Sequence, residues 1–162
     1  MRQFRGLQLK DWLTLCNAAC GLGALLVFTN SYWFAAALVA AAAVFDFLDG
    51  KVARKGQPDA FGKELDSLAD AVSFVAAPAV MLSVSGGNEM AIAFAAVLFA
   101  FAGLVRLARY NLQEEKGVYV GLPVPIAAFV LVVAMPFTNG YAFVLAIALG
   151  ILMASHVRLK KL

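Results

Sequence analysis

The sequence predicts an all-α protein that crosses a membrane with six helices and begins with a short N-terminal interfacial helix. Hydrophobic residues make up 63% of the 162 residues and charged residues only 14%, whereas a soluble domain averages about 45–50% apolar and about 25% charged residues. Several apolar runs approach the roughly 20 residues that a membrane-spanning helix needs. The basic residues are confined to alternate connections between these runs. Together these observations exclude a soluble globular domain.

The first half of the chain predicts an interfacial segment and three spans. Residues 1–12 interleave apolar and basic side chains, as a segment lying on a membrane surface does. The next apolar run stops at Asn30, and the run after it stays apolar until Asp46. A stretch containing Gly and Pro, residues 55–59, breaks the pattern before a third run. The expected spans are residues 13–29, 32–54 and 61–84.

Turn signals divide the second half in the same way. Ser-Gly-Gly-Asn at 85–88 and Thr-Asn-Gly at 138–140 are typical turn sequences. The charged stretch 113–120 separates the remaining two runs, and two prolines lead into the second of them. The expected spans are residues 90–111, 121–137 and 141–157. We expect residues 1–162 to form a single integral-membrane domain.

The basic residues also predict the orientation in the membrane. All thirteen Lys and Arg lie in the N-terminal segment, the second connection, the fourth connection or the C-terminal tail, counting adjoining helix ends. The other connections carry one charge, Glu89. Cytoplasmic loops of membrane proteins are enriched in Lys and Arg, so both termini are expected in the cytoplasm, with an even number of spans. Because the basic residues are dispersed rather than gathered in a patch, no nucleic-acid partner is expected.

Four aspartates lie in the second and third runs, where a bilayer makes ionised side chains costly. Asp46 and Asp49 are three residues apart and share one helix face. Asp66 and Asp70 are four residues apart and share a face of the next helix. The short connection makes the two helices antiparallel neighbours. We therefore expect the two acidic faces to oppose each other just inside the cytoplasmic boundary.

Such a cluster requires compensating charge or protonation, because close carboxylates repel one another. Basic side chains of the same segment could neutralise ordinary helix-end acids: Lys51, Arg54, Lys55 and Lys63. Divalent cations could also hold the carboxylates together, and oxygen ligands suit Mg²⁺, Mn²⁺ or Ca²⁺. Small residues on the same faces leave room for a substrate, and Arg54 offers a planar group suited to phosphate. The cluster therefore predicts metal-dependent phosphoryl-group chemistry on a lipid-linked substrate.

The motif that contains these residues is Asp-x2-Asp-Gly-x2-Ala-Arg-x7-Gly-x3-Asp-x3-Asp, from Asp46 to Asp70. It resembles the signature of the CDP-alcohol phosphatidyltransferases, a family of membrane enzymes with spans of this number and length. The resemblance implies a pair of divalent metal ions, Mg²⁺ or Mn²⁺, ligated by Asp46, Asp49, Asp66 and Asp70. It implies that Asp70 is also the general base and that the protein is a homodimer. It assigns CDP-lipid binding to Gly50, Ala53, Arg54 and Gly62.

Four further stretches resemble the phosphatidylserine synthase branch of this family: residues 14–21, 66–74, 106–111 and 121–125. The reaction that this resemblance implies belongs to phospholipid biosynthesis. A phosphatidyl group passes from CDP-diacylglycerol to the hydroxyl of serine, and CMP is released.

The acceptor site is expected outside the motif. The carboxylate of serine requires a cationic partner, and Arg106 and Arg109 lie on one face near the cytoplasmic end of the fourth span. They could equally be ordinary membrane-anchoring residues. Asn17 could reach the acceptor or the nucleotide, or form a hydrogen bond between helices.

Other functions remain open from the sequence. The donor could be CDP-archaeol, and the acceptor could be glycerol 3-phosphate or inositol phosphate. A divalent-cation transporter would also use clustered carboxylates, although it would place them nearer the bilayer midplane on broken helices.

Overall fold

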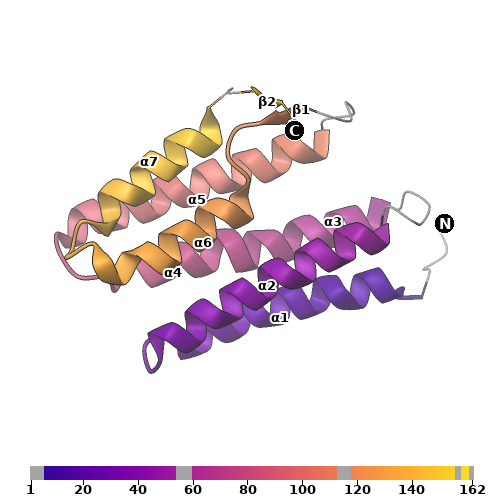
Figure 1. Ribbon diagram of the computed structural model, residues 1–162, viewed down its shortest axis with the longest axis horizontal. Helices are drawn as coiled ribbons and strands as arrows, with labels where there is room; N and C mark the ends of the chain where they lie inside the picture. Colours follow the sequence, from indigo (N-terminus) through magenta and orange to yellow (C-terminus); the bar gives the residue numbers. More distant parts are fainter. Residues whose placement is uncertain (1–5, 54–59, 113–117, 156–157, 161–162) are drawn as a thin grey trace.

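The computed structural model describes residues 6–53, 60–112, 118–155 and 158–160. They form a bundle of helices (Figure 1). The elements are α1 (Leu9–Val27), α2 (Tyr32–Ala53), α3 (Ala60–Asp70), η1 (Ala71–Ala76), α4 (Ala77–Leu82), α5 (Glu89–Leu112), β1 (Val118–Val120), α6 (Val124–Ala134), η2 (Met135–Phe137), α7 (Ala142–Ala154) and β2 (Arg158–Lys160). The helical class predicted from the sequence is confirmed.

The first two helices, α1 and α2, form an antiparallel hairpin. Apart from Asp49, the residues that α2 buries are small or β-branched: Ala35, Ala36, Val39 and Ala42. Small side chains let helices approach closely in lipid. The residues that α1 buries lie along one stripe: Asp11, Thr14, Asn17, Gly21 and Ala24. This stripe brings three polar side chains against α2 and the helix that follows it.

The third helix runs without a break through α3, η1 and α4, from Ala60 to Leu82. Its middle segment, Ala71–Ala76, is a π-helix, in which the N–H of Ala77 donates to the carbonyl of Val72. Pro78 follows this segment, and proline both lacks an N–H and clashes with the carbonyl four residues earlier. The wider turn accommodates that proline. It begins directly after Asp70, and π-turns are frequent at functional sites.

A close contact fixes the position of α1 against this third helix. A Cβ placed on Gly21 would lie 2.6 Å from the Cα of Ser73, so only glycine fits there. The hydroxyl of Ser73 donates a hydrogen bond to the backbone carbonyl of Asn17 at 2.9 Å. The spacing of the two helices beside Asp70 is therefore set by backbone atoms.

The other half of the bundle consists of α5, α6 and α7. α5 packs along α7, and α6 contacts α2, η1 and α7. The buried residues here are apolar, with Phe99 of α5 and Leu149 of α7 as examples. At Gly150 a Cβ would lie 2.8 Å from Leu98 Cδ2, so a glycine again permits close packing.

The two ends of the bundle differ. α1 and α3 begin, and α2 ends, toward the right of Figure 1, whereas the turns at 28–31, 83–88 and 138–141 lie toward the left. At the left end, a Cβ on Gly87 would lie 2.5 Å from the carbonyl oxygen of Gly140. Both glycines have positive φ angles, so two turns meet backbone to backbone. Successive connections thus alternate between the ends, as the sequence predicts.

The expected interfacial helix in residues 1–12 needs correction. Within the described part of this segment, Gly6–Gln8 are not helical and Leu9–Trp12 form the first turn of α1. A capping box explains the extension: the Gln8 N–H donates to Asp11 Oδ2 at 2.8 Å, and the reciprocal contact is also present. α1 therefore begins inside the polar segment rather than after it.

Helix length distinguishes the expected spans from one another. Tyr32–Ala53, Ala60–Leu82 and Glu89–Asn111 are long and apolar enough to cross a membrane. Val124–Phe137 and Ala142–Ala154 are shorter apolar helices. The antiparallel pairing of β1 with β2, with Val118 opposite Lys160, was not expected from the sequence. This pairing joins segments far apart in the chain, so the sequence contains no hairpin-turn signal from which it could be predicted.

Candidate active site

Three of the four motif aspartates meet between α2 and α3. Asp46 and Asp49 come from the last turns of α2, and Asp66 comes from the second half of α3. One carboxylate oxygen from each lies within 4.8 Å of the other two. The helical spacing in the sequence therefore does bring the two acidic faces together.

Asp49 is oriented by a side chain of α1. The hydroxyl of Thr14 donates to Asp49 Oδ2 at 2.7 Å, and both residues are buried. The same hydroxyl also approaches the carbonyl of Lys10 at 3.0 Å. One oxygen of Asp49 is thus held by α1.

Asp70 lies beside this group rather than within it. It is close enough to Asp46, Asp49 and Asp66 to interact with each electrostatically. Asn17 Nδ2 donates to Asp70 Oδ1 at 3.0 Å. All four carboxylates were expected to share the metals. The structure groups three of them, and Asp70 lies next to this group with a hydrogen bond to the side-chain amide of Asn17.

The cluster fits a hard divalent cation. Asp66 Oδ1 is buried and has no hydrogen-bond partner among the residues described, and a buried unpaired carboxylate oxygen is costly. All-oxygen donor sets suit Mg²⁺ and Mn²⁺. A cation among Asp46, Asp49 and Asp66 would satisfy the unpaired oxygen and remove the repulsion between the acids.

The small residues of the motif differ in how much space surrounds them. A Cβ on Gly50 would meet nothing within 4 Å, so this glycine faces open space. A Cβ on Gly62 would lie 2.9 Å from Lys10 Nζ and 3.3 Å from Asp11 Oδ1. Ala53 is exposed at the end of α2, and Arg54 lies outside the described residues.

The arginines expected to bind the acceptor lie on the last part of α5. Arg106 is half-buried, and its Nε is buried with no hydrogen-bond partner in the described parts of the chain. Arg109 is exposed, and its Nη1 is 3.5 Å from the carbonyl of Ala154 at the end of α7. Among the described residues, no hydrogen bond or ion pair joins either guanidinium to the carboxylate cluster.

A set of hydrogen bonds does join the end of α5 to α3. Asn111 Nδ2 donates to Ser67 Oγ at 2.6 Å, and Ser67 Oγ donates to the carbonyl of Lys63 at 3.1 Å. Lys63 Nζ in turn donates to the carbonyl of Asn111. These contacts fix the helix that carries Asp66 and Asp70 against the helix that carries Arg106 and Arg109.

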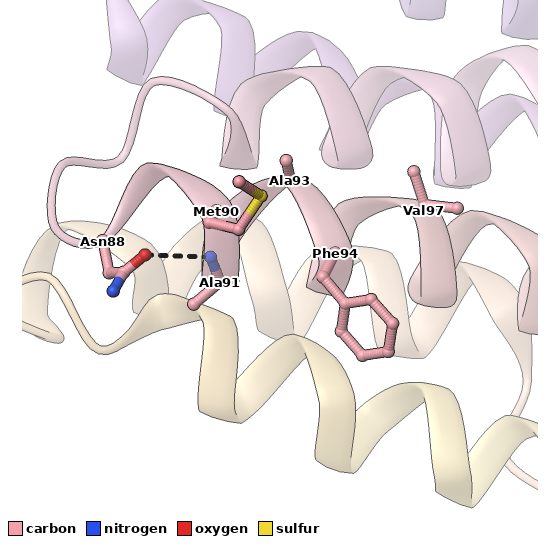
Figure 2. A pocket seen from close by; sticks show the side chains of 6 residues that line it. All are labelled: Asn88, Met90, Ala91, Ala93, Phe94 and Val97. Carbon is pink, nitrogen blue, oxygen red and sulfur yellow. Dashed lines mark hydrogen bonds between the residues drawn. The ribbon is translucent and has the colours of Figure 1, made fainter.

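An apolar hollow lies elsewhere on α5. Figure 2 shows the residues that line it: Asn88, Met90, Ala91, Ala93, Phe94 and Val97. Asn88 Oδ1 accepts from the Ala91 N–H at 3.1 Å and so begins the helix. The hollow belongs to the first half of α5, whereas Arg106 lies near the other end of that helix. It is therefore not part of the site.

Two residues around the carboxylates were missed from the sequence, Thr14 and Ser73. Thr14 supports Asp49, and Ser73 fixes the backbone of Asn17. The available signal was the recurrence of polar residues at 11, 14 and 17 in an otherwise apolar helix, which places them on one face.

Comparison with known proteins gives a consistent result. The family model described as CDP-alcohol phosphatidyltransferase matches residues 7–157. A Methanocaldococcus jannaschii protein named CDP-diacylglycerol–serine O-phosphatidyltransferase is 39% identical over 94% of this chain and 74% of its own length. An archaetidylserine synthase of Methanothermobacter thermautotrophicus is 38% identical over 92% of this chain and 68% of the relative. A Helicobacter pylori CDP-diacylglycerol–serine O-phosphatidyltransferase is 35% identical over 85% of this chain and 66% of the relative.

Proposed function

The chain belongs to the CDP-alcohol phosphatidyltransferase family, and from that premise we propose that it transfers a phosphatidyl group from CDP-diacylglycerol to L-serine. The products are phosphatidylserine and CMP. The names of relatives at 35–39% identity support serine as the acceptor. Membership of the family makes the protein a membrane transferase of phospholipid biosynthesis, and gives no support to a divalent-cation transporter.

The observation that carries this proposal is the grouping of Asp46, Asp49 and Asp66 within 4.8 Å, with Asp70 held beside them by Asn17. We propose that the four aspartates hold two divalent ions, Mg²⁺ or Mn²⁺. Bound there, the ions would polarise the diphosphate of the donor and offset the charge on the departing phosphate. Thr14 keeps Asp49 in place for this purpose.

Asp70 is proposed as the general base. The serine hydroxyl gives its proton to Asp70 while its oxygen forms a bond to the phosphorus that bears diacylglycerol. The bond from that phosphorus to the bridging diphosphate oxygen breaks, and CMP leaves with the electron pair. Asn17 contributes by fixing Asp70 Oδ1, which leaves the other oxygen to accept the proton.

The donor is proposed to lie against the small residues of the motif. Gly50 faces open space, so the donor can approach the backbone there. Ala53, Gly62 and Arg54 are proposed to complete the CDP-lipid site, with Arg54 on the nucleotide phosphates.

The acceptor is proposed to be bound from α5 and α1. The carboxylate of serine would pair with Arg106 or Arg109, since a guanidinium binds a carboxylate through paired hydrogen bonds. Arg106 Nε has no partner among the described residues. Asn17 Oδ1 is likewise buried without a described partner and could accept from the serine ammonium.

A second donor has one observation in its favour. The relative from Methanothermobacter thermautotrophicus is named an archaetidylserine synthase and is 38% identical. Archaeal and diacylglycerol lipids differ in their chains rather than in the diphosphate. CDP-archaeol is therefore the alternative donor, with the same acceptor and chemistry.

We further propose six membrane spans, with both termini and the site facing the cytoplasm, and a homodimer within one domain, residues 1–162. The alternation of connections between the two ends of the bundle supports the even count. The confinement of Lys and Arg to one set of connections supports the orientation.

One assay tests this function. The purified protein is incubated with CDP-diacylglycerol or CDP-archaeol, Mg²⁺ or Mn²⁺, and one acceptor at a time: serine, glycerol 3-phosphate or inositol phosphate. We expect CMP release with serine alone, its loss on chelation with EDTA, and its return when the metal is restored. Release with a phosphorylated acceptor in place of serine would overturn the acceptor, and release that survives chelation would overturn the metal.

A further inference from the structure

We infer that Asp11 binds the nucleoside half of the donor, with its free Oδ1 accepting a hydrogen bond from the N4 amine of cytosine. Asp11 lies outside the motif that defines the family. The inference rests on the proposed function, because it requires a CDP-linked donor at this site.

The first observation is that Asp11 is buried with half of its carboxylate unused. Its side chain is 2% exposed. Oδ2 accepts the Gln8 N–H at 2.8 Å as part of the capping box. Oδ1 is buried and lacks a hydrogen-bond partner within the described residues. Capping needs only one oxygen, so the cap does not account for the second, and leaving a carboxylate oxygen buried without a donor is costly.

The second observation is the position of this oxygen. A Cβ on Gly62 would lie 3.3 Å from Asp11 Oδ1, so the backbone of α3 passes directly beside this oxygen. The same point is 2.9 Å from Lys10 Nζ. A ligand entering here would displace the end of a flexible lysine chain rather than the backbone.

The third observation is the order of residues along α1 and α3. Asp11, Thr14 and Asn17 share the buried stripe of α1, and the latter two contact Asp49 and Asp70. Asp11 precedes them on the stripe and faces Gly62, which precedes Asp66 by four residues, or about 6 Å along a helix. Asp11 therefore lies one helical turn outward from the carboxylates, toward the end of the bundle where α1 and α3 begin.

The donor has a matching order of parts. The diphosphate of the donor belongs at the cluster of Asp46, Asp49 and Asp66. The lipid and the nucleoside are attached to opposite ends of the diphosphate, so they extend from the cluster in different directions. The apolar chains belong in the membrane, so the polar nucleoside extends outward past Gly62. It then reaches Asp11. Carboxylates accept hydrogen bonds from the N4 amine of cytosine, whereas uracil has an acceptor oxygen at that position.

The test compares nucleotides on the wild-type protein, and so does not depend on any variant folding. Binding of CDP, N4,N4-dimethyl-CDP, UDP and 2′-deoxy-CDP is measured by calorimetry in detergent with Mg²⁺ and no acceptor. We expect the dimethyl analogue, which has no N–H to donate, and UDP to bind at least about tenfold more weakly than CDP. Equal binding of CDP and its dimethyl analogue would overturn the inference while leaving the proposed function intact. Failure to bind CDP at all would count against the proposed function itself.

A variant then assigns the preference to Asp11. Asp11→Asn keeps an oxygen for the Gln8 N–H but presents an N–H₂ group in place of one oxygen. We expect it to lose most of the preference for CDP over UDP, with an unchanged thermal unfolding midpoint. Glu64→Gln makes the same chemical change at an exposed position of α3 and should retain the preference. An unaltered preference in Asp11→Asn would overturn the assignment. The assignment would also be overturned if 2′-deoxy-CDP bound more weakly than CDP to the wild type but equally well to Asp11→Asn. That result would place the contact on the ribose.

Discussion

The two halves of the bundle pack their helices by the same means but bury different chemistry. Gly21 lets α1 approach η1, and Gly150 lets α7 approach α5. Yet in the described part of the chain, every buried polar side chain belongs to the first half. These residues are Asp11, Thr14, Asn17, Asp49, Asp70 and Ser73. α5, α6 and α7 bury apolar residues instead.

This difference shows where the molecule tolerates the cost of buried polar groups. Such groups are retained where partners satisfy them, and here Thr14 serves Asp49 while Asn17 serves Asp70. Asp66 Oδ1, Asp11 Oδ1 and Asn17 Oδ1 lack partners among the described residues. They lie where a metal, a nucleotide and the serine ammonium, respectively, are proposed to bind. The first half therefore carries the proposed metal and donor sites, whereas the second half contributes the α5 arginines proposed for the acceptor.

The largest effect is expected at Asp70. Asp70→Asn preserves shape but cannot accept the serine proton, so CMP release should fall by about 10²–10⁴-fold. Binding of CDP, measured by calorimetry, should remain. Glu64→Gln, on an exposed face of α3, is the matched control. Activity within tenfold of the wild type would remove Asp70 from the role of base.

A smaller effect is expected at the groups that support Asp70. Asn17→Ala removes the amide that holds Asp70 Oδ1, so kcat should fall by about tenfold or more, while KM for the CDP-lipid stays constant. Ser73→Ala removes only the hydrogen bond to the Asn17 backbone and should lower kcat by about two- to fivefold. If both variants lower the unfolding temperature but leave kcat unchanged, Asn17 is a packing residue and the comparison between the halves weakens.

The smallest effect on chemistry is expected in the second half. Phe99 is fully buried in α5, so Phe99→Ala leaves a cavity that costs about 3 kcal/mol of stability. The kcat of the folded fraction should stay within about twofold of the wild type, because Phe99 belongs to the apolar core. Phe101→Ala is the control, since Phe101 is 67% exposed on the same helix and should change neither property. A tenfold loss of kcat in folded Phe99→Ala would show that the halves are coupled.

Much of the carboxylate cluster could be predicted from the sequence, because its geometry is local. Residues three or four apart on a helix share a face in any surroundings. The connection between α2 and α3 is short, so the two helices pack antiparallel. The meeting of Asp46 and Asp49 with Asp66 follows from these two facts. The helical class follows equally directly from the length of the apolar runs.

What could not be predicted depends on contacts between distant segments. Thr14 lies 35 residues from Asp49 in the chain, and the polar stripe on its own helix does not say which residue it contacts. The burial of Asp11 was not predicted, because the sequence indicated that residues 1–12 lie on the membrane surface. The capping box formed by Gln8 and Asp11 instead starts α1 at Leu9. The β1–β2 pair likewise depends on tertiary contacts alone.

The contact between Gly21 and Ser73 has a consequence for how the sequence can vary. A Cβ at position 21 would collide with the Cα of Ser73, not merely with its hydroxyl. Shortening residue 73 therefore cannot create space for a larger residue 21. In a mutational library, position 21 should accept glycine alone, while position 73 should accept alanine at a cost in turnover. Tolerance at one position and intolerance at the other would separate a constraint imposed by the backbone from one imposed by catalysis.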